Sequence, residues 1–193
     1  GALSYLANLM LRRGDFAGGA ELFKRAIDAG ATDSTLFLHY WGALLRAGAS
    51  DRVLHDRLVA FDRRFPEPPI FRFLLARLLA GSTDATVADP ERALEIAAAL
   101  QEAQPVPQHS ELLAFTLAAN GDFAGAQKLQ ENLVEMARVS GAWMHVAMLE
   151  QAAESYRANR LPEPLWSPQD PMFTPPPVDP DPVMRNYPAA QPY

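Results

Sequence analysis

The pentapeptide GDFAG occurs twice in this chain of 193 residues, at Gly14–Gly18 and again at Gly121–Gly125. The surrounding residues also agree, since RRGDFAGGAELF contains the first copy and ANGDFAGAQKLQ the second. Amphipathic stretches with apolar residues at helical spacing precede and follow each copy. A glycine in the left-handed conformation can end the first helix, and the aspartate after it can cap the second. Each copy therefore predicts a tight turn between two helices, with Phe16 or Phe123 anchoring the turn in the core.

A turn of this kind also occurs at Gly48, and the interval from Gly14 to Gly48 defines a period. Gly48 follows an apolar-periodic segment and precedes a second helix that ends near Pro66. The interval from Gly48 to Gly121 is slightly longer than two such periods. The long polar turn Gly81–Pro90 accounts for this surplus, and its last residues predict the start of another helix.

The repeated pattern resembles the tetratricopeptide repeat (TPR), a helix-turn-helix unit of about 34 residues. The interval from Gly14 to Gly48 matches this period. The resemblance covers about residues 2–139 and is clearest in the first and fourth units, at Leu3, Leu6, Ala7, Met10, Gly14, Phe16, Gly19, Phe23 and Ala26, and at Leu113, Ala114, Leu117, Gly121, Phe123, Ala126 and Leu133. It implies an all-α, right-handed TPR-like helical solenoid of about four helix pairs. An amphipathic helix over about 142–159, with Trp143 and Tyr156 among its apolar residues, is expected to cap the open end, which completes a repeat domain over residues 1–160.

The composition changes abruptly after Arg160. Residues 161–193 hold eleven of the 17 prolines, which excludes a helix or an interior strand. A disordered linker is the ordinary interpretation of such a segment. Large apolar side chains recur along it, however, as they do in extended ligands that dock in grooves. We therefore expect an extended proline-rich C-terminal arm that docks on the solenoid or on a neighbouring copy, with Trp166, Phe173, Tyr187 and Tyr193 as its anchors.

The sequence offers no chemistry for catalysis. The absence of cysteine excludes disulfides and thiolate metal sites, and the four histidines are scattered over separate helical regions. No phosphate loop or hydrolase motif is present. We expect no enzyme activity, no cofactor and no metal. A net charge of −6 without a Lys/Arg block argues against a nucleic-acid partner, and no apolar run is long enough to predict insertion in a membrane.

The first helix of each TPR unit lines the concave surface, so the resemblance implies where a partner would bind. The residues expected on that face are Asn8, Leu11, Arg12, Leu38, Arg46, Arg77 and Phe115, together with Ser4, Gly42, Leu45, Phe73, Glu111 and Ala118. Arg12, Arg46 and Arg77 could form a basic ladder that receives carboxylates or carbonyl oxygens, the alternative being ordinary solvated arginines. Only Asn8 matches the lysine and asparagine clamp with which some family members bind chaperone tails, so that role is disfavoured.

These features predict a non-catalytic scaffold or assembly subunit that binds a protein partner or an adjacent copy of itself. One alternative is a peptide-binding adaptor in a bacterial envelope, secretion or pilus pathway. Another is an accessory TPR domain of a larger enzyme, because the chain starts abruptly inside a helical pattern. The bias toward Ala and Arg suggests a bacterial protein, and both cytoplasm and periplasm remain open as its compartment.

Overall fold

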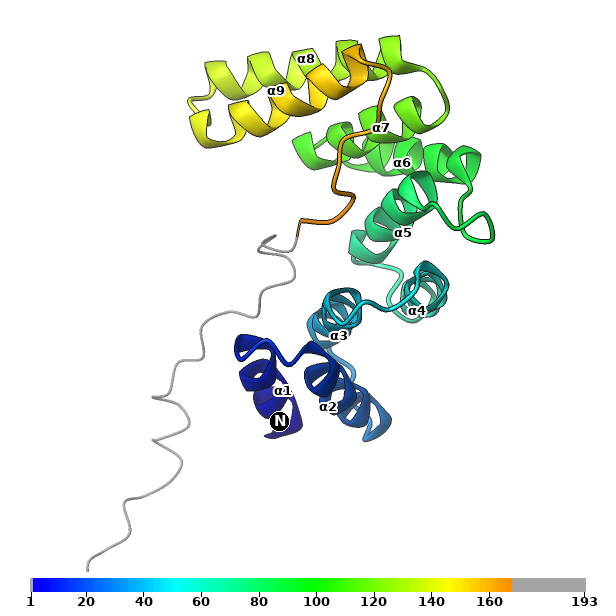
Figure 1. The fold of residues 1–193 in the computed structure, drawn as a ribbon, viewed down its shortest axis with the longest axis vertical. Coiled ribbons are helices and arrows are strands. Elements are labelled where there is room, and N and C mark those ends of the chain that lie inside the picture. The colour runs from blue at the N-terminus through cyan, green and yellow to red at the C-terminus, as the bar shows by residue number, and fades with distance from the viewer. Residues whose placement is uncertain (1, 168–193) are drawn as a thin grey trace, which may run out of the picture.

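The computed structural model describes residues 2–167, and this part of the chain is all-α. The arm residues Phe173, Tyr187 and Tyr193 lie outside the described range. Nine helices occur within that range: α1 (Ala2–Arg12), α2 (Phe16–Asp28), α3 (Ser34–Arg46), α4 (Asp51–Arg64), α5 (Ile70–Gly81), α6 (Pro90–Ala103), α7 (Pro107–Ala119), α8 (Phe123–Val139) and α9 (Trp143–Arg157). They follow one another in chain order along the long axis of the molecule, from α1 and α2 at one end to α8 and α9 at the other (Figure 1).

The helices pack in sequential pairs, each against the next helix in the chain, and α5 also packs against α7. This arrangement confirms the expected all-α fold and the expected helix-turn-helix organisation. The last expected helix, about 142–159, is present as α9. The helices are short, from 11 to 17 residues, so tertiary packing of their apolar faces supplies most of their stability.

The two GDFAG turns have nearly the same geometry. Gly14 and Gly121 adopt the left-handed conformation with φ of +81° and +87°, as the sequence predicted for the ends of α1 and α7. Phe16 and Phe123 start the following helices, and each packs against a core cluster, Phe16 against the main cluster and Phe123 against the one that contains Ala126. Glycine is required at the first position of the pentapeptide because other residues rarely adopt this φ.

Each turn is closed by an aspartate cap. The carboxylates of Asp15 and Asp122 accept hydrogen bonds at 2.8 Å from the backbone N–H groups of Gly18 and Gly125. A Cβ atom added at Gly18 or Gly125 would collide with the capping carboxylate. The absence of a side chain at the last glycine of each pentapeptide leaves room for the carboxylate in this position, although Asp89 caps α6 in the same way through the N–H group of Arg92, where no glycine is present.

The core is richest in aromatic side chains where α3, α4 and α5 meet. Phe37 and Phe61 pack edge to face with ring centroids 4.8 Å apart, and Phe61 and Phe71 do so at 5.5 Å. Trp41 is fully buried beside them. Towards α9 the core changes character, because Ala114, Ala118, Ala126 and Tyr156 form a cluster of mostly small side chains between α7, α8 and α9.

The long polar turn after α5 folds back on α4. The hydroxyl group of Ser82 donates a hydrogen bond to the carboxylate of Asp51, and the Arg52 side chain donates one to the carbonyl of Thr86. Val87, the residue after Thr86, is buried in the main core cluster. The extra residues of this turn therefore pack as a defined loop and connect α5 to α6 without disturbing the order of the stack.

Helix α9 buries one face and exposes apolar residues on the other. Leu149, Ala153 and Tyr156 are buried against α8 and α7, whereas the side chain of Trp143 is 66% exposed and that of Met144 94% exposed. Trp143, one of the apolar residues of the expected amphipathic helix, is thus the first residue of α9 and does not pack in the core. Among the described helices, none combines the length and apolar character needed to cross a bilayer.

Candidate functional site

The segment Leu161–Ser167, which we call the strap, follows α9 and turns back along the stack. In Figure 1 it is the orange segment that runs from the end of α9 past α7 and α5 toward α3. Leu161, Leu165 and Trp166 pack against the main core cluster, and each is partly buried. The first part of the predicted arm therefore lies on the helices of its own chain.

Trp166 packs against the buried side chain of Trp41. Its ring meets the ring of Trp41 edge to face, with centroids 5.1 Å apart and ring planes at 76°. Trp41 is itself fixed, because it is fully buried and its indole Nε1 donates a hydrogen bond at 3.1 Å to the carbonyl of Leu54 on α4. An edge-to-face pair of this kind is stabilising beyond the area that it buries.

Arg77 of α5 holds the backbone of the strap. Its Nε donates a hydrogen bond at 2.9 Å to the carbonyl oxygen of Leu165. The same guanidinium lies 5.7 Å from the ring centroid of Trp166 and 5.3 Å from that of Phe115 on α7. One arginine thus combines a charge-assisted hydrogen bond with contacts to two aromatic rings.

Leu165 occupies space that the absence of a side chain at Gly81 leaves open. A Cβ atom added at Gly81 would collide with Cδ1 of Leu165 and would lie 3.1 Å from Cζ of Phe115. Gly81 is the last residue of α5, so the glycine serves close packing here and not a left-handed turn. We call Trp41, Arg77, Gly81 and Phe115 the strap site.

Two ionisable groups lie close to the charge of Arg77. Burial raises the pKa of Glu111 on α7, while the positive charges of Arg77 and His145 act in the opposite direction. Burial likewise raises the pKa of Tyr156 on α9 far above its ordinary value, again against the influence of Arg77. Burial therefore favours the neutral form of both groups, and the positive charge of Arg77 opposes it at both.

The structure brings together three residues that the sequence analysis assigned to separate elements of the site. Arg77 and Phe115, expected on the partner-binding face, meet Trp166, expected as an anchor of the arm. Trp41 and Gly81 were not predicted to take part. The apolar pair Leu165-Trp166 at the start of the proline-rich segment indicates that this segment packs on a surface. It does not indicate that the surface contains Trp41 and Gly81.

Five further predicted residues lie on α1 and α3: Asn8, Leu11, Arg12, Leu38 and Arg46. Leu11 is buried in the core and Leu38 packs against its edge, whereas Arg12 is exposed. The guanidinium of Arg46 lies 4.0 Å from the ring centroid of Phe16, so it stacks on the first GDFAG turn. Oδ1 of Asn8 is buried without a hydrogen-bond partner among the described residues.

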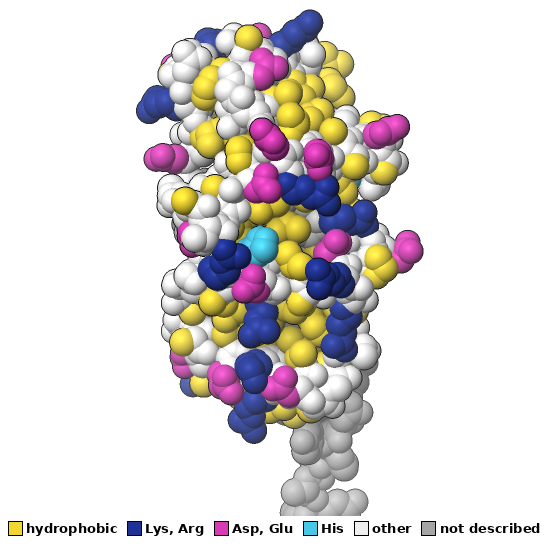
Figure 2. All heavy atoms as spheres, turned by 90° about the vertical axis from the view of Figure 1, so that its right-hand side faces the viewer, with side chains coloured by type: hydrophobic (Ala, Val, Ile, Leu, Met, Phe, Trp, Pro, Cys, Tyr) yellow, Lys and Arg dark blue, Asp and Glu magenta, His cyan; other side chains and the backbone are white. Residues whose placement is uncertain are grey.

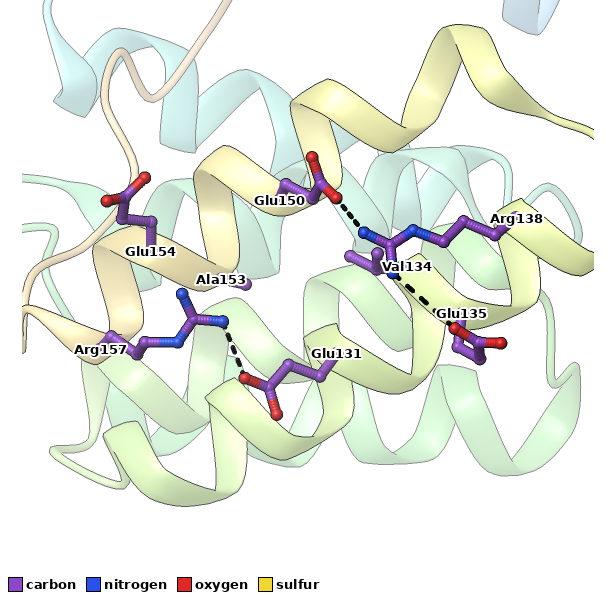
Figure 3. Close-up of a pocket in the computed structure, with 8 residues that line it drawn as sticks. All are labelled: Glu131, Val134, Glu135, Arg138, Glu150, Ala153, Glu154 and Arg157. Carbon is purple, nitrogen blue, oxygen red and sulfur yellow. Dashed lines mark hydrogen bonds and ion pairs between the residues drawn. The ribbon is translucent and has the colours of Figure 1, made fainter.

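A second hollow lies between α8 and α9, and it is strongly charged. Figure 3 shows two ion pairs across it, one between Arg138 and Glu150 and one between Arg157 and Glu131, the latter at 2.9 Å. Hydrogen bonds from Gln127 and Arg157 hold the pKa of the Glu131 carboxyl below its ordinary value. All four charged side chains are exposed, so these pairs link the two helices weakly and do not form a shielded reaction site.

The surface chemistry elsewhere is mixed. On the face drawn in Figure 2, Lys and Arg side chains are interspersed with Asp and Glu, and hydrophobic side chains fill the spaces between them. Within residues 2–167, no three His, Asp or Glu side chains are grouped closely enough to hold a metal ion.

Comparisons with protein-family models, with curated proteins and with solved structures gave no match.

Proposed function

We propose that this protein is a non-catalytic scaffold whose helices form a right-handed TPR-like solenoid and whose inner face binds extended polypeptide. The sequential helix pairs and the two equivalent GDFAG turns support the repeat architecture. The strap site supports the binding role. In this proposal, a protein partner or an adjacent copy of the chain is held through the helical surface and the proline-rich arm.

The observation that carries the proposal is the hydrogen bond from Arg77 to the backbone carbonyl of Leu165. A surface that recognises extended chain needs a donor for a main-chain carbonyl, which every sequence offers, and places for particular side chains, which provide selectivity. The inner face has both. Arg77 supplies the donor, Gly81 leaves space for a leucine, and Trp41 provides a wall for an aromatic ring.

Arg12 and Arg46 lie on α1 and α3, toward the N-terminal end of the predicted binding face. Under the proposal, these two arginines add charged contacts to the same bound polypeptide or neighbouring copy. The site needs no activated nucleophile and no general acid or base, which agrees with a binding role.

The test compares an inner-face double variant, Arg12→Ala with Arg46→Ala, with a control, Arg92→Ala on the exposed side of α6. Native mass and copurifying partners are measured for both and for the parent chain. We expect the inner-face variant to lose self-association or partner retention while the control keeps it. Equal mass and equal partners in all three proteins would contradict the proposal, as would a turnover abolished by changing a single Glu or His.

A further inference from the structure

Two consecutive residues of the strap contact the strap site, and Leu161 packs separately against the core. Leu165 contributes its side chain, seated over Gly81 beside Phe115, and its carbonyl oxygen, bonded to Arg77. Trp166 contributes its ring, placed against Trp41. These two residues supply the contacts of the strap with the strap site, so an identical strap from another copy of the chain can make the same contacts.

The strap can leave the site without breaking a helix. It follows the end of α9 after Ala158–Arg160, which are exposed, and the chain turns there at Asn159, whose φ is +53°. Leu165 and Trp166 are only partly buried, whereas the core residues beneath them come from the helices. Detachment would therefore expose one side of Trp41 and Phe115 and would release Leu161 from the core clusters it packs against, while the helices keep their own hydrogen bonds.

A detached strap can bind the strap site of another copy of the chain. Every copy of this chain carries both a strap and a strap site that match, and exchange of an identical element is a low-cost route to an assembly. Short connections such as the one after α9 favour exchange of this kind. Within one chain, the tether gives the strap an effective concentration on the order of millimolar, so the closed form competes with binding from outside.

We propose that the strap site binds the strap of a second copy of this chain, and that the strap of the same chain occupies it as an internal competitor. This inference rests on the proposed binding role of the inner face and specifies the partner. The assembly then depends on concentration, because exchange requires opening of the closed form and then an encounter between copies. The exchanged contacts are those of the closed form: Leu165 over Gly81, its carbonyl on Arg77, and Trp166 against Trp41.

A complementation experiment tests the exchange. One full-length variant loses the site through Arg77→Ala with Gly81→Val, and keeps its strap. The other loses the strap through Leu165→Asp with Trp166→Ala, and keeps its site. Each variant alone should run at the mass of a single copy, whereas an equimolar mixture should form a species with one copy of each. Circular dichroism of both variants confirms that their helix content equals that of the parent, and the single substitution Gly81→Val replaces the site variant if the double variant does not fold.

A labelled peptide of residues 161–167 separates the exchange from the binding site itself. We expect it to bind the strap variant at least tenfold more tightly than the parent, because the site of the parent is already occupied. Peptide binding without a mixed species would overturn the exchange proposal and leave the proposed peptide-binding function standing. Absence of both would show that the strap is a fixed part of the fold, and would overturn the inference and the binding role of this surface together.

Discussion

Trp166 of the strap lies edge to face against the buried Trp41 of α3, with ring centroids 5.1 Å apart. This contact joins the proline-rich segment to the aromatic part of the core, at the point where α3, α4 and α5 meet. Arg77 also holds the strap in place, because its Nε donates a hydrogen bond to the carbonyl oxygen of Leu165. The strap is therefore attached at a place where the helices are themselves well ordered by large buried side chains.

Trp166→Ala should lower the stability of the folded protein and leave its helix content unchanged. The substitution removes a partly buried ring and its edge-to-face contact, a loss of about 1–3 kcal/mol. Denaturation followed by circular dichroism measures it. The matched control is Trp143→Ala on α9, because that ring is 66% exposed and should contribute little. Equal losses in the two variants would mean that the strap contact does not stabilise the fold.

Asp122→Ala should destabilise the α7–α8 turn by about 1 kcal/mol, since it removes the N-cap of α8. Gly125→Ala should disturb the same cap, because the added methyl group would collide with the capping carboxylate, while the higher helix propensity of alanine offsets part of this loss. The two changes break the same hydrogen bond, so the double variant should be less destabilised than the sum of the single variants. Equilibrium unfolding of the three variants gives the coupling free energy, and strict additivity would contradict the shared role.

Asp15→Ala provides an independent comparison in the first GDFAG turn. Its carboxylate accepts the same hydrogen bond, also at 2.8 Å, and its backbone conformation is nearly the same as that of Asp122. Loss of this cap should therefore cost about as much as loss of the cap at Asp122. A clear difference between the two would show that the surroundings of the turn, and not its own hydrogen bond, determine its contribution.

The turns were predictable from the sequence because their causes are local. A left-handed glycine, an aspartate that caps the next helix, and an aromatic residue in the first turn all act within one short segment, and the structure confirms each at Gly14–Gly18 and Gly121–Gly125. Helical periodicity gave the all-α fold for the same reason. The exposed position of Trp143 could not be predicted because an apolar residue at the start of a helix can face either side, and the packing of α9 on α8 decides which.

The strap site could not be predicted in the same way because its contacts join distant segments. The resemblance placed Arg77 and Phe115 on one face, and the structure finds both beside the strap. Gly81 gave no signal, since the space it leaves has meaning only when Leu165 is in place. In the sequence, nothing distinguishes Trp41 from an ordinary core residue. Its contact with Trp166 depends on the path that the chain takes after α9.

Acidification should destabilise the protein through His39 of α3. Burial lowers the pKa of this half-buried imidazole below its ordinary 6.5, against the opposing charge of Asp33. The unfolded chain therefore binds a proton more readily than the folded one, so stability falls as the pH drops below 6.5 toward the folded-state pKa. The parent and His39→Gln should differ in unfolding free energy by a constant amount above this range and converge or cross below it.

Glu111 acts in the opposite direction, which makes the comparison with a matched variant necessary. Its raised pKa means that the folded protein binds the proton more readily, so its contribution to stability increases as the pH falls toward 4.5. This contribution is common to the parent and His39→Gln and cancels in their difference. A pH-independent difference between the two proteins would show that the burial of His39 does not shift its titration.

Ala126→Asp should unfold the region where α7, α8 and α9 meet. Ala126 is fully buried against Ala114, Ala118 and Tyr156, in a cluster of mostly small side chains with no space for a carboxylate. Burial of an unpaired charge there should cost several kcal/mol and reduce the helical signal in circular dichroism. The matched control is Ala124→Asp, which lies just before it in the first turn of α8 and is exposed, where an acidic residue favours the helix N-terminus. We expect the control to melt at or above the temperature of the parent. If Ala126→Asp melts with the parent instead, the helix pairing that places Ala126 in this contact is wrong.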